Sequence, residues 1–550
     1  MHRVPIHVRT VAVAGVAIVG VVAGGALPGA AASHVSARHV ILLSVDGMHQ
    51  SDLTWYVGEH PRSVLAALTS RGVQFTMAQT PVPSDSYPGI VAQATGGNPS
   101  STGIYYDDTY NHALLPPGTS NCATATPGTE VPYEEALDRN PNALDAGQGI
   151  SPLPAGILNM TANPDTVINP ANLPVDPASC QPVYPHSYLR VNTMFEVARA
   201  AGLRTAWSDK HPAYEILNGP SGTGVQDLFT PEINSQAPTL GSPIDWAQDN
   251  ALTQQYDSYK VQAVLNEIDG YDHSRTHLVG TPAIFGMNFQ TVSTAQKLPV
   301  SDGLKGGYQP DGVTPAPLLR RALDFIDTQV ARMVSELHRT DIARDTVIIL
   351  SAKHGQSPQD PAALTRIDDG AIISAIDAAW MATHPAAAPL VAFAVDDDGM
   401  LMWLSDRSAA ATSFVKHFLL TLSGTGNGIN GNPKPFSHAG LTTVYAGAAA
   451  AAYFHVQPGD PRVPDIFGIA QYGVVYTGGT AKIAEHGGTN PQDRHVPLLV
   501  AGDPVTQARS RSATVETTQI APTILALLGL DPNWLQAVQI EHTQVLDLSS

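Results

Sequence analysis

Residues 81–97 read PVPSDSYPGIVAQATGG and place one serine where a hydroxyl group is chemically useful. Asp85 precedes Ser86, and the small-residue run that follows is typical of a helix that ends at Gly96 and Gly97. Ser86 would then lie at a helix N-terminus, where free backbone N–H groups and the helix dipole favour an anion. Since a serine ahead of a helix is commonly just an N-cap, a function for Ser86 needs other residues beside it.

Asp46 is the first of these residues. It follows the apolar run VILLSV of residues 40–45, which is typical of a buried strand with a functional residue at its C-terminal end. A carboxylate there and a hydroxyl on a helix N-terminus are the usual beginnings of a metal-assisted phosphoryl-transfer site. With helical spacing in residues 61–72 and a second strand at 73–78, the order of elements predicts an α/β fold with a doubly wound parallel sheet.

Length and charge limit the classes of protein. The 550 residues suffice for one large α/β domain with insertions or for two or three smaller domains. Residues 1–32 have the basic start, apolar run and small-residue cleavage site of a signal peptide, and the alternative is an uncleaved membrane anchor. This segment holds two arginines and no acidic residue, so its removal changes the net charge from −19 to −21. A protein with this negative net charge is not expected to bind nucleic acid through a basic surface.

The sequence therefore predicts a protein that is secreted, periplasmic or on the cell surface, with no membrane span after signal cleavage. Its only two cysteines, Cys122 and Cys180, lie in the exported part, which favours one disulfide over two free thiols. They fall within residues 105–185, where Pro, Asn and Asp recur without sustained periodicity. We expect this stretch to be an insertion pinned by the disulfide, since it is too long for an idle loop.

Polar residues also lie next to three later apolar segments, after two of them and before the third. The strand predicted at 204–207 runs into SDKHP, whose Lys210 and His211 are candidates for substrate contact. The strand predicted at 347–350 runs into SAKHGQ, which contains Lys353 and His354, and His486 lies in AEHGG ahead of a strand at 496–500. In a mostly parallel sheet, strand C-termini meet at one edge, where a binding site forms.

In this order the motifs resemble the alkaline phosphatase superfamily and, within it, the type I phosphodiesterase/nucleotide pyrophosphatase branch. The resemblance covers nearly all of residues 33–550 and rests on LLSVDGM, SYPG, SAKHGQ, AEHGG and, near the end, TTQIAPTILALLG. It implies an alkaline-phosphatase-like domain over 33–550, with a central mostly parallel sheet, flanking helices and loop-rich insertions. It also implies a covalent phosphoryl-enzyme intermediate formed between two metal ions, commonly zinc.

The resemblance assigns roles to single residues. Asp46, His354 and His486 match metal ligands of the family, and Ser86 matches its nucleophile. Asp85, which precedes the nucleophile, resembles the aspartate of the Asp-Ser pair in alkaline phosphatases proper. We group it with Lys210 and His211 as candidate substrate-binding residues.

The departures from the family matter as much as the matches. Lys353 stands where the family has the aspartate of Asp-His-Gly, and Val292 and Gln296 stand where it has a further aspartate and histidine. Three of the six ligands besides the nucleophile are therefore missing, which argues against a complete two-metal site. Lys353 could instead place a fixed positive charge on the phosphoryl oxygens, the alternative being a solvated surface lysine.

We accordingly expect at most one firmly bound divalent ion, zinc by the resemblance, held by Asp46, His354 and Ser86 with water or Asp85. The predicted function is an exported hydrolase of small phosphoesters that works through Ser86. One alternative is a family member that binds an anionic ligand without turnover, and another is a phosphonate or sulfate ester hydrolase. The sulfatase motif Cys-x-Pro-x-Arg is missing, while the choice of monoester or diester and the oligomeric state stay open.

Overall fold

The computed structural model describes residues 35–133, 137–238 and 244–549, so the predicted signal peptide lies outside the described residues. Eight strands form its central sheet. Their order across the sheet is β20 (Arg509–Glu516), β2 (Val73–Gln79), β19 (Leu499–Ala501), β10 (Thr346–Ser351), β1 (His39–Val45), β7 (Ile284–Phe289), β5 (Ala206–Ser208) and β6 (Asp227–Phe229).

The sheet is mostly parallel, as predicted. β1 pairs in parallel with β10 and β7, and β5 pairs in parallel with β7 and β6. β19 runs antiparallel to its neighbours β10 and β2. Because of this reversal, β19 starts at the edge where the parallel strands end, and the segment before it, with His486, reaches that edge.

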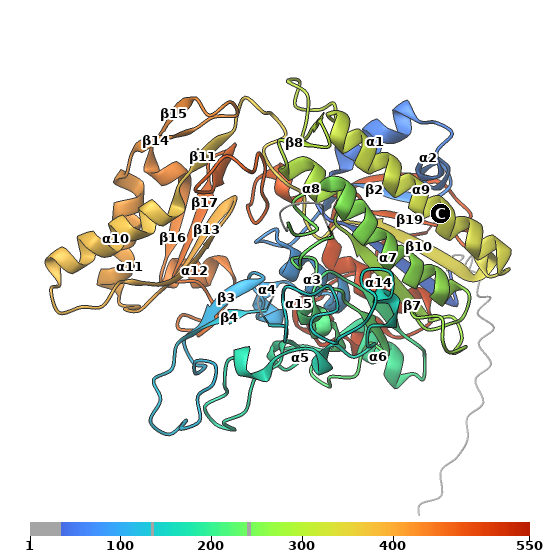
Figure 1. Cartoon of the computed structure of the whole chain (residues 1–550), viewed down its shortest axis with the longest axis horizontal. Coiled ribbons are helices and arrows are strands. Elements are labelled where there is room, and N and C mark those ends of the chain that lie inside the picture. The colour runs from blue at the N-terminus through green and yellow to red at the C-terminus, as the bar shows by residue number, and fades with distance from the viewer. Residues whose placement is uncertain (1–34, 134–136, 239–243, 550) are drawn as a thin grey trace, which may run out of the picture.

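Alternate side chains of the strands pack into two separate cores. On β1, Val40 and Leu42 belong to one core, and Ile41 and Leu43 belong to the other. The first core is covered by α3 (Ser86–Thr95), α6 (Met194–Ala200) and α14 (Ile520–Leu527). The second is covered by α7 (Asn250–Ile268), α8 (Thr291–Lys297) and α9 (Pro317–Arg339), and Figure 1 shows α7 and α9 side by side across the sheet.

A smaller lobe lies at the far side of the molecule from α9 (Figure 1, in orange). Its main sheet is antiparallel and packs against α10 (Asp369–Thr383) and α11 (Ala409–Thr421). The strands of this sheet, in order, are β12 (Val391–Asp396), β13 (Gly399–Leu404), β17 (Ile466–Ala470) and β16 (Leu441–Ala446). A second sheet contains β15 (Pro433–Phe436), β14 (Gly424–Asn427), β11 (Thr365–Ile367) and β18 (Val474–Tyr476).

The insertion predicted at 105–185 contains a hairpin of β3 (Asp108–Asn111) and β4 (Thr129–Pro132) and several short 3-10 turns. Cys122 and Cys180 form a disulfide, which confirms their predicted pairing. Apolar residues of the insertion, such as Val131 and Ile168, are buried in the first core. The segment is therefore packed onto the domain and is more than a loop on its surface.

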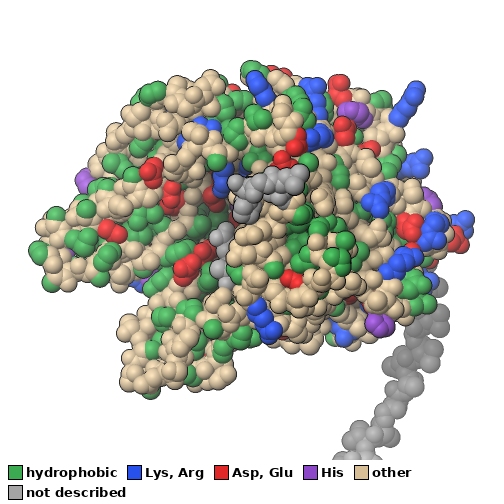
Figure 2. Space-filling model, viewed as in Figure 1, with side chains coloured by type: hydrophobic (Ala, Val, Ile, Leu, Met, Phe, Trp, Pro, Cys, Tyr) green, Lys and Arg blue, Asp and Glu red, His purple; other side chains and the backbone are tan. Residues whose placement is uncertain are grey.

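The surface agrees with the low content of basic residues. On the face shown in Figure 2, lysine and arginine side chains stand singly or beside acidic ones, mainly over the side that carries α9. No continuous basic patch is visible among the described residues of this face. Within the described ranges, no helix has both the length and the hydropathy required to cross a bilayer.

Candidate active site

Ser86 is the first residue of α3, as the sequence predicts. Asp85 caps the helix, because its Oδ2 accepts a hydrogen bond from the Tyr87 backbone N–H at 3.0 Å. All residues of α3 are buried, and the helix ends at Gly96 in the left-handed conformation, with φ of 81°. The Ser86 side chain is thus held at a rigid, buried helix N-terminus.

Gly89 allows α3 to approach the segment that follows β10. A Cβ atom at this position would lie 2.2 Å from the backbone oxygen of Lys353, so a larger residue would push the helix away. The close contact brings the first turn of α3 beside Lys353 and His354.

Three side chains converge on the Ser86 hydroxyl. Lys210 Nζ donates a hydrogen bond to Ser86 Oγ at 3.0 Å, His354 Nε2 lies 3.2 Å from Oγ, and Asp46 Oδ2 lies 3.5 Å from it. These residues follow β5, β10 and β1, whose C-terminal ends meet at one edge of the sheet. Asp46 and His354 therefore lie at the same edge as predicted.

The Asp46 carboxylate is fully buried and surrounded by nitrogen groups. Its Oδ2 accepts a hydrogen bond from Gln290 Nε2 at 2.6 Å and lies 3.9 Å from Lys353 Nζ and 4.0 Å from Lys210 Nζ. Burial alone would raise the pKa of Asp46, but the Lys353 ammonium and His354 lower that pKa well below its ordinary value. Asp46 is therefore an anion that balances the two lysines.

Lys353 is a buried charge with its own partners, not a solvated surface lysine. Its Nζ lies 2.8 Å from Asp209 Oδ1 and 4.0 Å from the centroid of the Tyr214 ring. Burial lowers the pKa of Lys353, while Asp209 and Asp46 oppose this shift. Lys353 therefore pairs with Asp209, and the lysine that contacts the Ser86 hydroxyl is Lys210.

The two histidines of the site lie against each other. The rings of His354 and His486 have centroids 4.0 Å apart, and His486 Nδ1 lies 3.2 Å from Asp85 Oδ1. Burial lowers the pKa of both imidazoles, which favours their neutral forms. His354 Nδ1 lies 2.9 Å from the Gly355 carbonyl oxygen, which can only accept a hydrogen bond, so Nε2 is left as the acceptor that faces Ser86.

His211 is turned toward another group. Its Nδ1 lies 2.7 Å from Glu232 Oε1 in a buried contact. Its role in substrate binding, like that of Asp85 and Lys210, stays a prediction.

The residues at the positions of two missing family ligands, Val292 and Gln296, make other interactions. Val292 packs in the second core, and the Gln296 amide donates to Tyr308 and Asp52. Gln290, which follows β7 directly, instead reaches Asp46. Sequence reasoning misses Gln290 and the partner role of Asp209, and the only signal for them is their place just after a strand.

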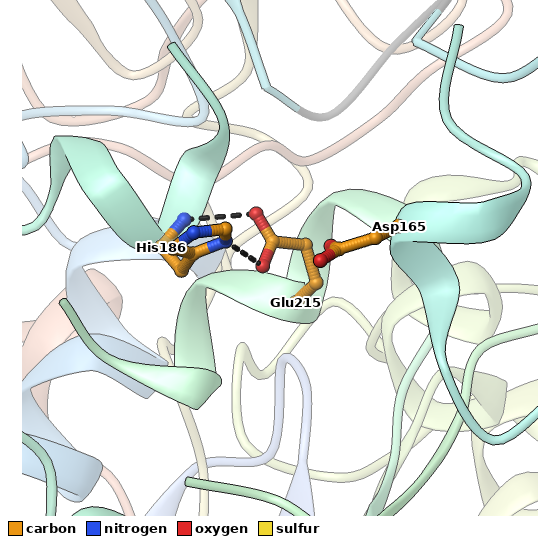
Figure 3. Close-up of side chains that lie close together, drawn as sticks. All are labelled: Asp165, His186 and Glu215. Atoms are coloured by element: carbon orange, nitrogen blue, oxygen red, sulfur yellow. Dashed lines mark hydrogen bonds and ion pairs between the residues drawn. The ribbon is translucent and has the colours of Figure 1, made fainter. Parts of the chain in front are cut away.

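Two groups of His, Asp and Glu have ligand atoms all within 4.8 Å of one another in the described part of the chain. One group is Asp165, His186 and Glu215. Figure 3 shows the Glu215 carboxylate hydrogen-bonded to His186 and facing Asp165. Burial raises the pKa of Glu215 to about 7. This group is a candidate set of metal ligands that does not include Asp46, His354 or His486.

The second group is Asp397, Glu485 and His486. Its Glu485 carboxylate already pairs with the ammonium groups of Lys297 and Lys482. Neither group includes Asp46 or His354, so the three predicted metal ligands do not form one compact set.

The donors around Asp46 do not fit a divalent ion. Asp46 Oδ1 is buried without a hydrogen-bond partner, but Oδ2 accepts from Gln290, and the lysines at 3.9 and 4.0 Å already balance the carboxylate. An ion bound there would lie beside two ammonium groups, whose charges repel it. The assignment of Asp46, His354 and His486 as metal ligands therefore stays a prediction that this arrangement argues against.

The chain is similar in fold to solved structures of ectonucleotide pyrophosphatase/phosphodiesterase 5. The murine protein gives a TM-score of 0.53 at 12% identity, with 93% of this chain and 100% of that chain covered, and its inactive form in complex with AMP gives the same values. The human protein gives 0.51 at 12% identity, covering 91% of this chain and 99% of that chain. No curated protein matches by sequence.

A family model described as type I phosphodiesterase / nucleotide pyrophosphatase matches residues 40–491. This range includes Asp46, Ser86, His354 and His486, the positions to which the resemblance assigns roles as metal ligands and nucleophile. The chain belongs to the type I phosphodiesterase/nucleotide pyrophosphatase family, within the alkaline phosphatase superfamily.

Proposed function

We propose that this chain hydrolyses phosphoric esters with Ser86 as the nucleophile, through a phosphoryl-enzyme intermediate. The observation that carries the proposal is the position of the Ser86 hydroxyl, at the N-terminus of α3 and within hydrogen-bond distance of Lys210 and His354. A helix N-terminus and a nearby cation both favour the anionic oxygens of a phosphoryl group. Membership of the family supports the same class of reaction.

The reaction has two steps. Ser86 Oγ first attacks phosphorus, so that the Oγ–P bond forms, the bond from phosphorus to the leaving oxygen breaks, and the hydroxyl proton ends on the leaving alcohol. Water then attacks the phosphoryl-serine, the Oγ–P bond breaks, and Ser86 regains a proton. Each cycle consumes one water molecule and releases an alcohol and a phosphate product.

We propose that the substrate is a small phosphoester that approaches from the side of Lys210 and His486. Ser86 itself is fully buried, whereas Lys210 keeps 8% and His486 keeps 7% of its surface exposed. Asp85, which contacts His486, lies on the same side. Because a murine neighbour was solved in complex with AMP, nucleotide esters are the first substrates to test.

We also propose that the chain is exported through the signal peptide at residues 1–32. The disulfide between Cys122 and Cys180 supports this proposal, since disulfides persist in oxidising compartments outside the cytosol. Mass spectrometry of the secreted protein tests it, because cleavage after Ala32 would give an N-terminus at Ser33.

The hydrolase proposal is tested with the purified secreted protein and four chromogenic esters: a phosphodiester, a phosphomonoester, a phosphonate and a sulfate. We expect turnover of a phosphoester that Ser86→Ala abolishes and that Ser413→Ala, a substitution on the exposed side of α11, leaves unchanged. Preferred turnover of the phosphonate or the sulfate would replace the proposed substrate class.

The alternative of binding without turnover has one specific observation in its favour, the loss of the family ligands at Val292, Gln296 and Lys353. It becomes the better conclusion if no ester is hydrolysed while AMP or inorganic phosphate still binds. Isothermal titration with the wild-type protein and with Lys210→Met distinguishes this result, because loss of the Lys210 cation should weaken the binding of either anion.

A further inference from the structure

We propose that Ser86 is activated without a divalent ion, with the Lys210 ammonium in the place that a metal ion takes in the family, and with Lys353 as the residue that positions Lys210. The inference rests on the proposed function for its reaction class. It differs from the prediction made on sequence alone, in which Lys353 acts on the substrate and an ion binds Asp46.

The contacts of Lys210 carry the first part. Its Nζ donates a hydrogen bond to Ser86 Oγ at 3.0 Å and lies 4.0 Å from Asp46 Oδ2. A group in this position bridges the nucleophilic oxygen and the carboxylate that follows β1, as a bound cation would. When Oγ loses its proton, the ammonium is already placed to stabilise the negative charge on that oxygen.

Asp209 connects the two lysines. Its Oδ1 accepts from the Lys210 backbone N–H at 2.9 Å and lies 2.8 Å from Lys353 Nζ, while its Oδ2 accepts from Trp207 Nε1 at 2.8 Å. Lys353 is fully buried and lies over the Tyr214 ring, so its ammonium has little freedom to leave Asp209. Lys353 therefore fixes the turn after β5 from which Lys210 reaches Ser86.

His354 completes the activation of Ser86. Because its Nδ1–H donates to the Gly355 carbonyl, its Nε2 accepts the hydrogen of the Ser86 hydroxyl at 3.2 Å. The 3.5 Å contact of Oγ with Asp46 Oδ2 is longer, and that oxygen already accepts the Gln290 amide at 2.6 Å. The hydroxyl thus donates to a neutral imidazole and accepts from an ammonium, a geometry that suits attack by Oγ.

The test measures the reactivity of Ser86 directly, with an alkyl fluorophosphonate as the probe. Ser86 Oγ forms a bond to phosphorus, the P–F bond breaks, fluoride leaves and the hydroxyl proton is released, and mass spectrometry follows the modified serine. The secreted wild-type protein is treated with a chelator, and its metal content is measured by inductively coupled plasma mass spectrometry. We expect the labelling rate to be unchanged after chelation and after later addition of zinc.

Four single variants and one double variant separate the roles of the two lysines. Lys210→Met should lower the labelling rate about a hundredfold or more, the loss typical of one electrostatic stabiliser, and Lys210→Arg should retain part of the rate because it keeps the charge. Lys416→Met, at an exposed position of α11, is the matched control and should label as the wild type does. Lys353→Met should lower the rate, and additional loss on combining it with Lys210→Met should be small, because both act through one ammonium.

Several results would overturn the inference. These are a labelling rate that falls on chelation and returns with zinc, a Lys210→Met protein that labels like the wild type, and a wild-type protein whose Ser86 does not label. The chelation experiment needs no variant, so the inference stays testable if Lys210→Met does not fold. A protein that labels at Ser86 but hydrolyses no ester contradicts the proposed function alone.

Discussion

Replacing Lys353 by aspartate tests how this site balances its charges. Lys353 Nζ lies 2.8 Å from Asp209 Oδ1 and 3.9 Å from Asp46 Oδ2, and the side chain is fully buried. Lys353→Asp removes the ammonium and adds a carboxylate beside two others. Since breaking a buried ion pair costs about 3–5 kcal/mol, we expect the free energy of unfolding in the absence of metal to fall by at least that amount.

Zinc should reverse much of this loss. The substitution restores the family's Asp-His-Gly and places carboxylates next to His354, which together are a suitable set of zinc ligands. An ion that binds only the folded state stabilises it by about 2.7 kcal/mol at a concentration one hundred times its Kd. The variant should therefore regain about that much stability in zinc, while the wild type should gain almost none.

Urea denaturation in zinc and in chelator measures both quantities, and isothermal titration calorimetry gives the Kd needed to choose the zinc concentration. Lys353→Met is the matched control, because it loses the charge but offers no ligand, and its stability should not respond to zinc. If zinc stabilises the wild type as much as Lys353→Asp, then Asp46 and its neighbours bind the ion despite the two lysines. That result would refute the charge argument.

Three further predictions rest on single features of the structure. Ser86→Ala should lower phosphoester hydrolysis by roughly a thousandfold or more without changing the fold, and steady-state kinetics beside circular dichroism would reveal a smaller loss. Replacing both Cys122 and Cys180 by serine should lower the free energy of unfolding by about 4 kcal/mol, since the disulfide joins residues 58 apart, and urea denaturation showing no change would contradict this. The third prediction concerns His273 Nδ1, which lies 2.5 Å from Asp227 Oδ1; burial opposes both charges, but the pair raises the pKa of His273 above 6.5 and lowers that of Asp227 below 3.8. The contribution of His273 to the free energy of unfolding is complete below pH 6.5 and is lost as pH rises through its raised pKa. The contribution of Asp227 is complete above pH 3.8 and is lost as pH falls through its lowered pKa. The difference in unfolding free energy between wild type and Asp227→Asn should therefore be greatest between these two pH values, and a difference that does not vary with pH would argue against the ion pair.

Local patterns suffice for many elements of the central domain. The apolar spacing of residues 317–339 predicts α9 with the ends that the structure has, and VILLSV forms the buried strand β1. The spacing of apolar residues does not predict the end of a helix where a capping residue sets that end. The apolar pattern alone predicts a helix from residue 256 to residue 268, but α7 begins at Asn250, because Asp249 caps it by accepting a hydrogen bond from the Leu252 N–H.

In the smaller lobe, the order of the strands in the sheet could not be predicted from the sequence. β13 pairs with β12 close in the chain but also with β17, more than sixty residues later. Composition around residues 391–404 predicts sheet and helix. The alternation of apolar residues along a strand, however, does not show which other strand it pairs with. Pairing over such separations depends on which faces pack together in the complete fold.

The amino-acid sequence alone establishes the order of the motifs, the nucleophile candidate at a helix N-terminus and the replacement of a family carboxylate by Lys353. These are properties of short segments, since strand and helix signals act over a few neighbouring residues. The consequence of this replacement depends on the fold, in which Lys353 pairs with Asp209, Lys210 contacts Ser86 and Gln290 donates a hydrogen bond to Asp46. These residues follow different strands, and the parallel strands bring their ends to one edge, where burial forces each charge to find a partner that no local pattern specifies.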